Sequence, residues 1–308
     1  MQLKLFKAAL WSPLLALALL SASSAFCAPA WAKVEVVTTY PYIAELVKEV
    51  GKDKVQVSAL ARGDWDPHFV VARPSLIAKL RKAELLVING AQLEIGWLPP
   101  LLRQANNAKV QPGQPGFLEL SNSVQLIQKP QNVSRAQGDV HPQGNPHFIT
   151  DPHLVPPLAK SVAEKLCQLE PGDCSDFRSN QAQFNQRWQA KLQGWDAQLK
   201  KLKGKKVLEY HRLHDYLIQR YGLILVGTVE PLPGIPPSPA HTAETVTRAK
   251  KAGVSLNLRG VYNPEPPSRF VSEKSGIPLI TLPHDVGAVP EAKDLFSLFD
   301  TLVSRLSR

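Results

Sequence analysis

Four histidines lie in sequence contexts that could bind a transition metal ion. They are His68 in GDWDPHF, His147 in GNPHFITDP, His211 in LEYHRLHDY and His284 in LPHDVG. Each follows a segment with the pattern of a β-strand or precedes one with the pattern of a helix, and ligands of open α/β sheets gather at such positions. Imidazole is the most common protein ligand for divalent transition metals. One such histidine alone is an ordinary polar residue, but three or four in the same setting predict a metal site built from distant segments.

The segments that must position the first of these histidines alternate between strands and helices. Residues 34–39 and 55–60 are rich in β-branched side chains, and the residues after Pro41 repeat apolar side chains at helical spacing between them. Residues 74–82 then predict a helix and residues 85–88 the next strand. This order predicts a mainly parallel sheet.

A second α/β unit is predicted towards the C-terminus. Its strands are expected at 207–210, 223–229, 254–261 and 278–282, with helices at 242–252 and at the C-terminus. Between the two units, residues 176–202 repeat large apolar side chains every three, four or seven positions without a proline. This pattern predicts one amphipathic helix about 40 Å long. The fold class is therefore α/β, with two lobes of mainly parallel sheet joined by a long rigid helix.

The N-terminus has the features of an export signal. Lys4 and Lys7 precede an apolar run over 8–20, and Ala30-Trp31-Ala32 has the small side chains of a cleavage site. The run is too short for a comfortable membrane span, which needs about 20 residues. We expect a signal peptide at 1–32 and a periplasmic mature protein.

The mature part, about 276 residues long, divides by these patterns into three predicted parts. They are an N-terminal lobe at 33–170, a linking helix at 171–203 and a C-terminal lobe at 204–308. The formal charge of +10 falls to +8 when Lys4 and Lys7 are removed. No run of Arg and Lys with interleaved aromatic residues is present, so a solvated basic surface is expected and nucleic acid is not an expected partner.

The three cysteines support two separate expectations. Cys27 offers lipoprotein anchoring as an alternative to cleavage, although the bulky Phe26 before it fits a lipidated cysteine poorly. Removal of the leader leaves Cys167 and Cys174, which an oxidising compartment favours as a disulfide. The short loop would give this bond about 2–3 kcal/mol of stabilisation. Two free thiols are the alternative, and no nearby Cys or His completes a metal site with them.

Five segments together resemble a known protein family. They are DPHFVVARPSLIAKLRKAELLVING, LEIGWLPPLLRQANN, GDVHPQGNPHFITDP, HRLHDYLIQRYGL and EPLPGIPPSPAHTAE. Over essentially the whole mature chain, the sequence is similar to the cluster A-I solute-binding proteins of ABC transporters for zinc and manganese. The resemblance implies two α/β lobes joined by a rigid helix, with a metal ion buried between them.

The resemblance also implies a set of metal ligands. Three histidines of the family match His68, His147 and His211. The fourth ligand of the family is usually a carboxylate near the end of the last strand, which favours Asp285 here, with His284 as the alternative. Adjacent residues on an extended segment point to opposite faces, so we expect only one of the two to reach the ion.

Zinc-binding members of the family often carry a long, His-rich and acidic loop. The corresponding residues here, 121–146, contain only His141, which becomes an auxiliary ligand candidate. Three imidazoles and one carboxylate suit tetrahedral Zn²⁺, whereas Mn²⁺ prefers more oxygen ligands. Histidines also bind Cu(II) and Ni(II) well, so affinity alone does not exclude these ions.

The expected function is therefore capture of Zn²⁺, and less readily Mn²⁺, by a monomer that delivers the ion to an ABC transporter permease. No enzymatic activity is expected. The alternatives are a secreted mononuclear zinc hydrolase, which needs an open coordination position and a base, and a metallochaperone on the same fold. The sequence contains no HExxH segment and no nucleophile elbow. His214, one turn beyond His211, is expected to face outward.

Overall fold

The chain is described by a computed structural model that covers Gln2 and residues 33–307 apart from 133–137 and 139. Lys33–Arg308 form one compact unit. The expected signal peptide and Cys27 lie outside the described residues, so both remain predictions. Among the helices that the structure describes, none has the length and apolar character to cross a membrane.

The N-terminal lobe contains a parallel sheet with the strand order β2-β1-β3-β4. Its strands are β1 (Val34–Thr38), β2 (Val55–Ala59), β3 (Leu85–Ile88) and β4 (Phe117–Glu119). Its helices are α1 (Pro41–Gly51), α2 (Pro74–Lys82), α3 (Leu98–Ala105) and α4 (Val155–Leu169). The predicted strands β1 to β3 are confirmed, whereas β4 and α3 were not predicted.

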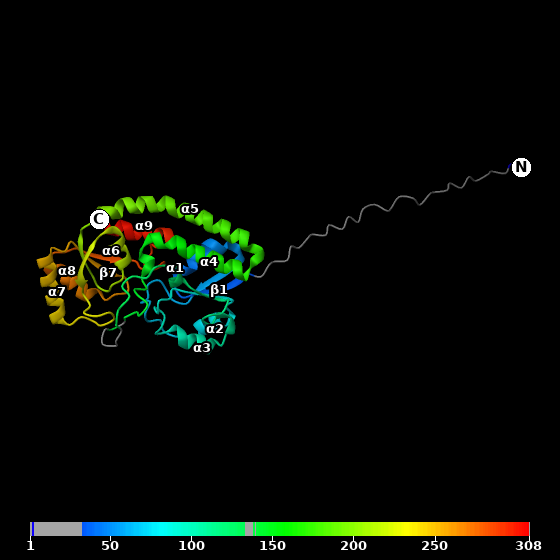
Figure 1. Ribbon diagram of the computed structural model, residues 1–308, viewed down its shortest axis with the longest axis horizontal. Helices are drawn as coiled ribbons and strands as arrows, with labels where there is room; N and C mark the ends of the chain where they lie inside the picture. Colours follow the sequence, from blue (N-terminus) through cyan, green and yellow to red (C-terminus); the bar gives the residue numbers. More distant parts are fainter. Residues whose placement is uncertain (1, 3–32, 133–137, 139, 308) are drawn as a thin grey trace. The chain divides into compact units, whose positions relative to one another are not determined.

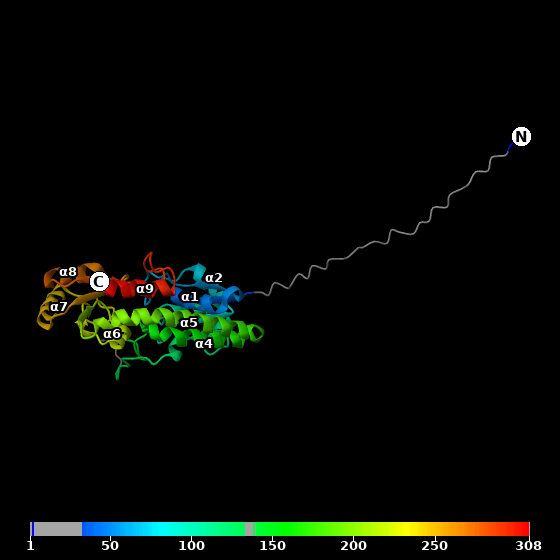
Figure 2. The same ribbon diagram turned by 90° about the horizontal axis from the view of Figure 1, so that it is seen from above.

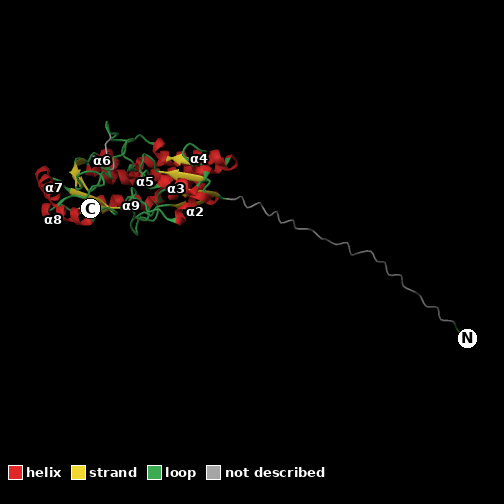
Figure 3. Cartoon of the chain, turned by 90° about the horizontal axis from the view of Figure 1, so that it is seen from below, coloured by secondary structure: helices red, strands yellow, loops and turns green. Residues whose placement is uncertain are grey.

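The C-terminal lobe repeats this arrangement with the strand order β6-β5-β7-β8. Its strands are β5 (Lys206–Glu209), β6 (Ile224–Thr228), β7 (Leu256–Gly260) and β8 (Leu279–Leu282). Its helices are α6 (Asp215–Tyr221), α7 (Pro239–Ala252), α8 (Glu265–Ser275) and α9 (Leu295–Leu306). Figure 3 shows the two groups of strands with helices around them. The predicted fold class, two α/β lobes with parallel sheets, is confirmed.

One long helix, α5 (Cys174–Leu199), connects the lobes and is extended by a 3-10 turn at Lys200–Leu202. Its large apolar side chains are buried at helical spacing: Phe177, Phe184, Trp188, Leu192, Trp195 and Leu199. Figure 1 shows α5 passing over α1, α4 and α9. The predicted single helix is confirmed, and it begins two residues earlier than expected.

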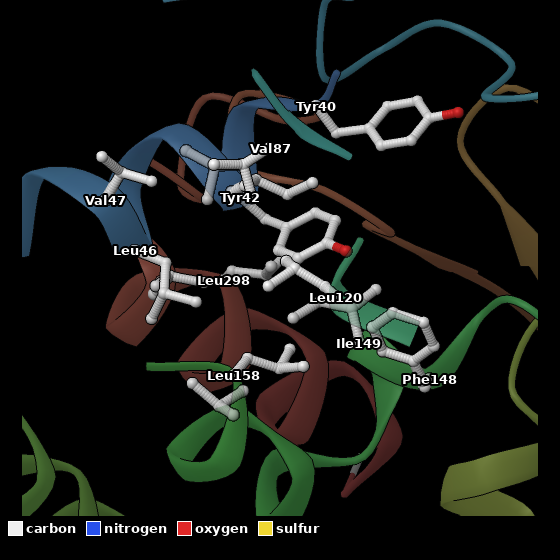
Figure 4. Close-up of a cluster of buried hydrophobic side chains, with 14 of the residues drawn as sticks. Tyr40, Tyr42, Leu46, Val47, Val87, Leu120, Phe148, Ile149, Leu158 and Leu298 are labelled. Atoms are coloured by element: carbon white, nitrogen blue, oxygen red, sulfur yellow. The ribbon is translucent and has the colours of Figure 1, made fainter. Parts of the chain in front are cut away.

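The core is continuous between the lobes because the C-terminal helix returns to the N-terminal lobe. Figure 2 shows α9 beside α1 and α5. In Figure 4, Leu46 of α1, Leu158 of α4 and Leu298 of α9 lie in one cluster of buried side chains. The lobes therefore share apolar packing in addition to α5.

The disulfide between Cys167 and Cys174 is confirmed, with an S–S distance of 2.11 Å. It joins the last turn of α4 to the first residue of α5. Shorter 3-10 turns, including Phe148–Thr150 and Pro152–Leu154, link His147 to α4.

Candidate metal site

Four histidines from both lobes form one group. The ring centroids of His68, His147 and His211 are 5.2 to 5.3 Å apart. The His141 ring lies 5.4 Å from that of His68 and 6.3 Å from that of His147. One ring nitrogen from each of His68, His141 and His147 lies within 4.8 Å of the others, a combination that no other trio of His, Cys, Asp or Glu makes among the described residues. We call His68, His141, His147 and His211 the histidine group.

His68 is oriented by the residue two positions before it. The Oδ1 atom of Asp66 accepts a hydrogen bond from the backbone N of His68 at 2.9 Å and lies 2.8 Å from its Nδ1. Burial opposes ionisation of Asp66, but the hydrogen bonds from His68 outweigh burial and lower the pKa of the carboxyl. With Nδ1 donating to Asp66, the buried Nε2 of His68 faces the histidine group without a protein partner.

His211 follows β5 and has a carboxylate partner of its own. The Oε1 atom of Glu230 lies 2.5 Å from Nδ1 of His211, and both side chains are buried. Burial lowers the pKa of His211, but the hydrogen bond and charge of Glu230 outweigh it and raise the pKa overall. Carboxylate partners of this kind fix the tautomer of a metal-binding histidine and strengthen it as a ligand. Glu230 was not among the predicted site residues, although an acid at the start of the Pro-rich loop after a strand was a visible signal.

His147 is buried and held by Asn145. The Oδ1 atom of Asn145 accepts from the backbone N of His147 at 2.9 Å. The amide of Asn145 donates to the carbonyl of Arg212 and to Asp215, which ties this N-terminal loop to the segment that carries His211. The Nε2 atoms of His147 and His211 are 3.2 Å apart.

Burial keeps two members of the group neutral. Desolvation, followed by the charges of the neighbouring histidines, lowers the pKa of His147 well below its usual value. The same causes lower the pKa of His141 to about 3. Because a neutral imidazole is the form that binds metal, these side chains are ready to coordinate an ion at neutral pH.

His284 and Asp285 lie outside the histidine group. His284 donates from Nε2 to the carbonyl oxygen of Trp65 at 3.1 Å, and burial lowers its pKa to about 4. The Oδ1 atom of Asp285 accepts from the backbone N of Tyr42 at 2.7 Å, in the first turn of α1, and from that of Val286 at 2.6 Å. Burial raises the pKa of Asp285 well above its usual value. The assignment of Asp285 as the fourth ligand stays a prediction.

His214 does not face outward, so that expectation was wrong. Its side chain is 1% exposed, and its Nδ1 lies 2.8 Å from Oε1 of Glu209. The same oxygen accepts from the backbone N of His214. Glu209 ends β5 in the core, and a buried carboxyl needs donors. His214 provides two of them and thereby shapes the turn that presents His211.

The histidine group borders a cavity of about 160 Å³. Its lining includes Asp66, His68, Phe69, His211, Glu230, Gly234 and Pro236. A smaller cavity of about 20 Å³ is lined by His147 together with both His284 and Asp285. A hollow of about 620 Å³ between β8 and α9 has no histidine in its lining.

Comparison with known proteins gives a family match over most of the chain. The family model described as "Zinc-uptake complex component A periplasmic" matches residues 36–307. The "High-affinity zinc uptake system protein ZnuA" of Bacillus subtilis (strain 168) is 24% identical over 267 residues, which are 84% of this chain and 77% of the relative.

A second relative and a solved structure agree with this family match. The "Zinc-binding lipoprotein AdcA" of Streptococcus pneumoniae is 25% identical over 223 residues, which are 71% of this chain but only 43% of the relative. A "Crystal structure of ZnuA" superposes with a TM-score of 0.72 and 21% identity, covering 90% of this chain and 98% of that one. At this identity, the structural match supports the fold alone.

Proposed function

Because the chain belongs to the family of periplasmic component A proteins of zinc-uptake complexes, we propose that it captures one divalent metal ion and delivers it to an ABC transporter permease for import. Zn²⁺ is the ion that fits the histidine group best. The observation that carries this proposal is the 3.2 Å distance between Nε2 of His147 and Nε2 of His211. Two ligands at Zn–N distances of 2.0–2.1 Å in a tetrahedron are separated by about 3.3 Å.

We propose that His68, His147 and His211 bind the ion through Nε2. Asp66 and Glu230 hold the Nδ1 atoms of His68 and His211, which leaves Nε2 for the ion. For the fourth position, the geometry favours His141 because one of its ring nitrogens lies within 4.8 Å of a ring nitrogen of His68 and of His147. Asp285 and His284 are the alternatives, because their backbone hydrogen bonds engage only Oδ1 of Asp285 and Nε2 of His284.

The ligand chemistry favours zinc over manganese. Four imidazoles give a soft, nitrogen-only shell, which suits tetrahedral Zn²⁺, whereas Mn²⁺ prefers carboxylate, carbonyl and water oxygens. The carboxylates nearest to the group, Asp66 and Glu230, are occupied by histidine Nδ1 atoms. Cu(II) and Ni(II) also bind imidazole, so selection among these ions depends on their availability.

The same geometry favours carriage over hydrolysis. A zinc hydrolase needs an open coordination position and a free base next to the metal-bound water. In the proposed site four histidines fill the coordination positions, and the nearby acids Asp66, Glu230 and Glu209 are each paired with a histidine. We therefore propose a binding protein without enzymatic activity. A metallochaperone would use the same site but would not need a permease.

We also retain the remaining expectations as proposals. The leader at 1–32 directs the chain to the periplasm, with lipid anchoring at Cys27 as the alternative. The mature protein acts as a monomer with the parts 33–170, 171–203 and 204–308.

The test is metal analysis of protein purified from the periplasm of its own host, followed by Zn²⁺ and Mn²⁺ titration of the apo form. One zinc ion per chain is expected. The variant His68→Ala/His147→Ala/His211→Ala should lose zinc, whereas His153→Ala should keep it, because His153 is paired with Asp196 outside the group. Wild-type zinc affinity in the triple variant would refute the site. Hydrolysis of model esters by the zinc form would favour the enzyme.

A further inference from the structure

The hydroxyl group of Tyr216 joins helix α6 of the C-terminal lobe to two backbone positions of the N-terminal lobe. It donates to the carbonyl oxygen of Asn145 at 2.7 Å and accepts from the backbone N of Ile127 at 3.2 Å. The backbone N of Asn145 donates in turn to the carbonyl oxygen of Ile127 at 2.9 Å. These hydrogen bonds link the three residues in a closed ring between the lobes. We call Tyr216, Ile127 and Asn145 the interlobe clasp.

The two backbone positions of the interlobe clasp lie next to two members of the histidine group. His141 lies between Ile127 and Asn145 in the chain, and His147 follows two residues after Asn145. The side chain of Asn145 also accepts from the backbone N of His147, so the position of Asn145 sets where the turn to His147 begins. The clasp therefore constrains the segment that carries both histidines.

Helix α6 also holds the His147 segment from its other side. The buried Asp151, in the turn after His147, accepts from Nε of Arg220 at 2.9 Å. His147 thus lies in the chain between two attachment points on one helix. Because α6 begins shortly after the turn that carries His211, the same helix adjoins both members of the His147–His211 pair. A rigid element that contacts both ligands can fix the distance between them.

The Tyr216 hydroxyl is suited to this role because it is buried and stays protonated. Its side chain packs in the core and is 4% exposed, and burial raises its pKa to about 12. Buried tyrosines usually find a hydrogen-bond partner, so a bonded hydroxyl alone indicates only stability. What points to the metal site is that both partners lie in the other lobe, on either side of His141 in the chain.

Tyr221 on the same helix provides the comparison. Its hydroxyl donates to Oδ1 of Asp196 in α5 at 2.8 Å. This hydrogen bond is as short as that of Tyr216 to Asn145, but it makes no contact with the segment from Ile127 to His147. The two tyrosines therefore differ in what their hydroxyl groups hold, while they share the helix and the kind of side chain.

We propose that Tyr216 is a positioning residue for the metal site, which holds His141 and His147 close to His211 before the ion arrives. This inference rests on the proposed function. Ordering a mobile ligand on binding costs free energy, and ligands that are already in place avoid that cost. Removal of the hydroxyl should therefore weaken zinc binding although Tyr216 is not itself a ligand.

The test compares Tyr216→Phe with the matched control Tyr221→Phe in the full-length mature protein. Each change removes one oxygen atom and keeps the aromatic ring, so core packing is retained. Zinc affinity is measured by chelator competition, zinc dissociation by a chase with excess chelator, and hydrogen exchange of the Ile127 amide by NMR in the apo form. Tyr216→Phe should lower zinc affinity about 10-fold, mainly through faster dissociation, and speed Ile127 exchange by at least about 10-fold.

The control should stay within about twofold of wild type in all three measurements, although urea should unfold both apo variants more easily than wild type because each loses a hydrogen bond. Wild-type zinc affinity and dissociation in Tyr216→Phe would overturn the inference, and so would unchanged Ile127 exchange. Equal losses in the two variants would also overturn it, because they would reflect only the stability of α6. Absence of zinc binding in the wild type would refute the proposed function itself, whereas zinc binding that is the same in all three proteins would refute this inference alone.

Discussion

The two lobes have the same strand order but contribute unequally to the histidine group. In the N-terminal lobe, the loops after β2 and β4 supply His68, His141 and His147, whereas the C-terminal lobe supplies only His211 after β5. The loop after β8 is the counterpart of the loop after β4, yet its His284 donates to the carbonyl of Trp65 instead. The strand topology therefore sets on which loops a ligand histidine can lie, and local hydrogen bonds decide whether that side chain faces the histidine group.

The difference between these histidines lies in the three-residue segment that ends at each of them. In Asp66-Pro67-His68 and Asn145-Pro146-His147, the first side chain accepts the backbone N–H of the histidine. In Leu282-Pro283-His284, the first residue is a buried leucine and offers no acceptor. An Asx residue two positions before a histidine fixes the turn that carries it.

The largest expected effect tests the two counterpart histidines directly. His147→Ala should weaken zinc binding at least about 1000-fold, or ~4 kcal/mol, because it removes a ligand and leaves its buried position empty. His284→Ala should change zinc affinity less than about threefold, because its Nε2 is held by the backbone of Trp65. Competition with a chelator at pH 7.5 measures both. A larger loss in the His284 variant would place that residue in the coordination shell.

Much of this architecture could be predicted from periodicity. The bounds of α2 and β3 match the expected residues, and α5 follows its apolar repeat. The helices α3 and α8 were not predicted, and each contains a Pro-Pro pair in its first turn, at Pro99-Pro100 and Pro266-Pro267. Proline is tolerated there because the first N–H groups of a helix have no intrahelical acceptor.

The candidate site was predictable in part. The rings of His68, His147 and His211 lie within 5.3 Å of one another, although only His211 closely follows a strand, β5, whereas His68 and His147 lie in long loops after β2 and β4. Their role as ligands stays a prediction. The partner of His211 is Glu230, from the next loop, and no spacing rule connects them. The Asx-Pro-His pattern is also not sufficient, because Asp151-Pro152-His153 makes the same turn but directs His153 to Asp196. Which element follows the turn decides the outcome.

The second prediction compares the turns that follow β3 and β7. In the N-terminal lobe, the Glu94 carboxylate accepts from the backbone N atoms of Asn89 and Gly90, whereas in the C-terminal lobe the neutral amide of Asn263 accepts from that of Gly260. Burial raises the pKa of Glu94 to about 7 from 4.5. Only the N-terminal turn should therefore respond to pH.

The direction of the change in stability with pH follows from the number of protons that the folded and unfolded states bind. Between pH 4.5 and 7, folded Glu94 keeps a proton that the unfolded chain has released, so its contribution to stability is complete below pH 4.5 and lost as pH rises through 7. The loss is on the order of 3 kcal/mol. Urea unfolding of wild type and Glu94→Gln at pH 5 and pH 8 should show this difference, with the exposed Glu164→Gln as control. Equal pH dependence in wild type and Glu94→Gln would show that Glu94 is ionised in both states.

The smallest expected effect compares the carboxylate partners of the two lobes. Glu230→Gln should weaken zinc binding about 10- to 100-fold, the usual range for the outer partner of a metal-binding histidine. For Asp66→Asn the loss of zinc affinity should be about 10-fold, the lower end of this range. The Asp66 side chain is 33% exposed against 5% for Glu230, so water can replace part of its interaction. An asparagine can also still accept the backbone N–H of His68. Asp64→Asn, which affects only the surface pair with Arg62, is the matched control.

A pH series separates this explanation from simple damage to the fold. Burial lowers the pKa of His211, but the hydrogen bond and charge of Glu230 raise it by more. Protons therefore compete with zinc for His211 at higher pH in the wild type than in Glu230→Gln. Acidification should therefore weaken wild-type binding first and narrow the ratio between the two proteins. Asp66→Asn should leave the His211 part of this profile nearly unchanged. A ratio that widens on acidification would contradict this explanation. A larger loss for Asp66→Asn than for Glu230→Gln would mean that the N-terminal lobe supplies the dominant carboxylate partner.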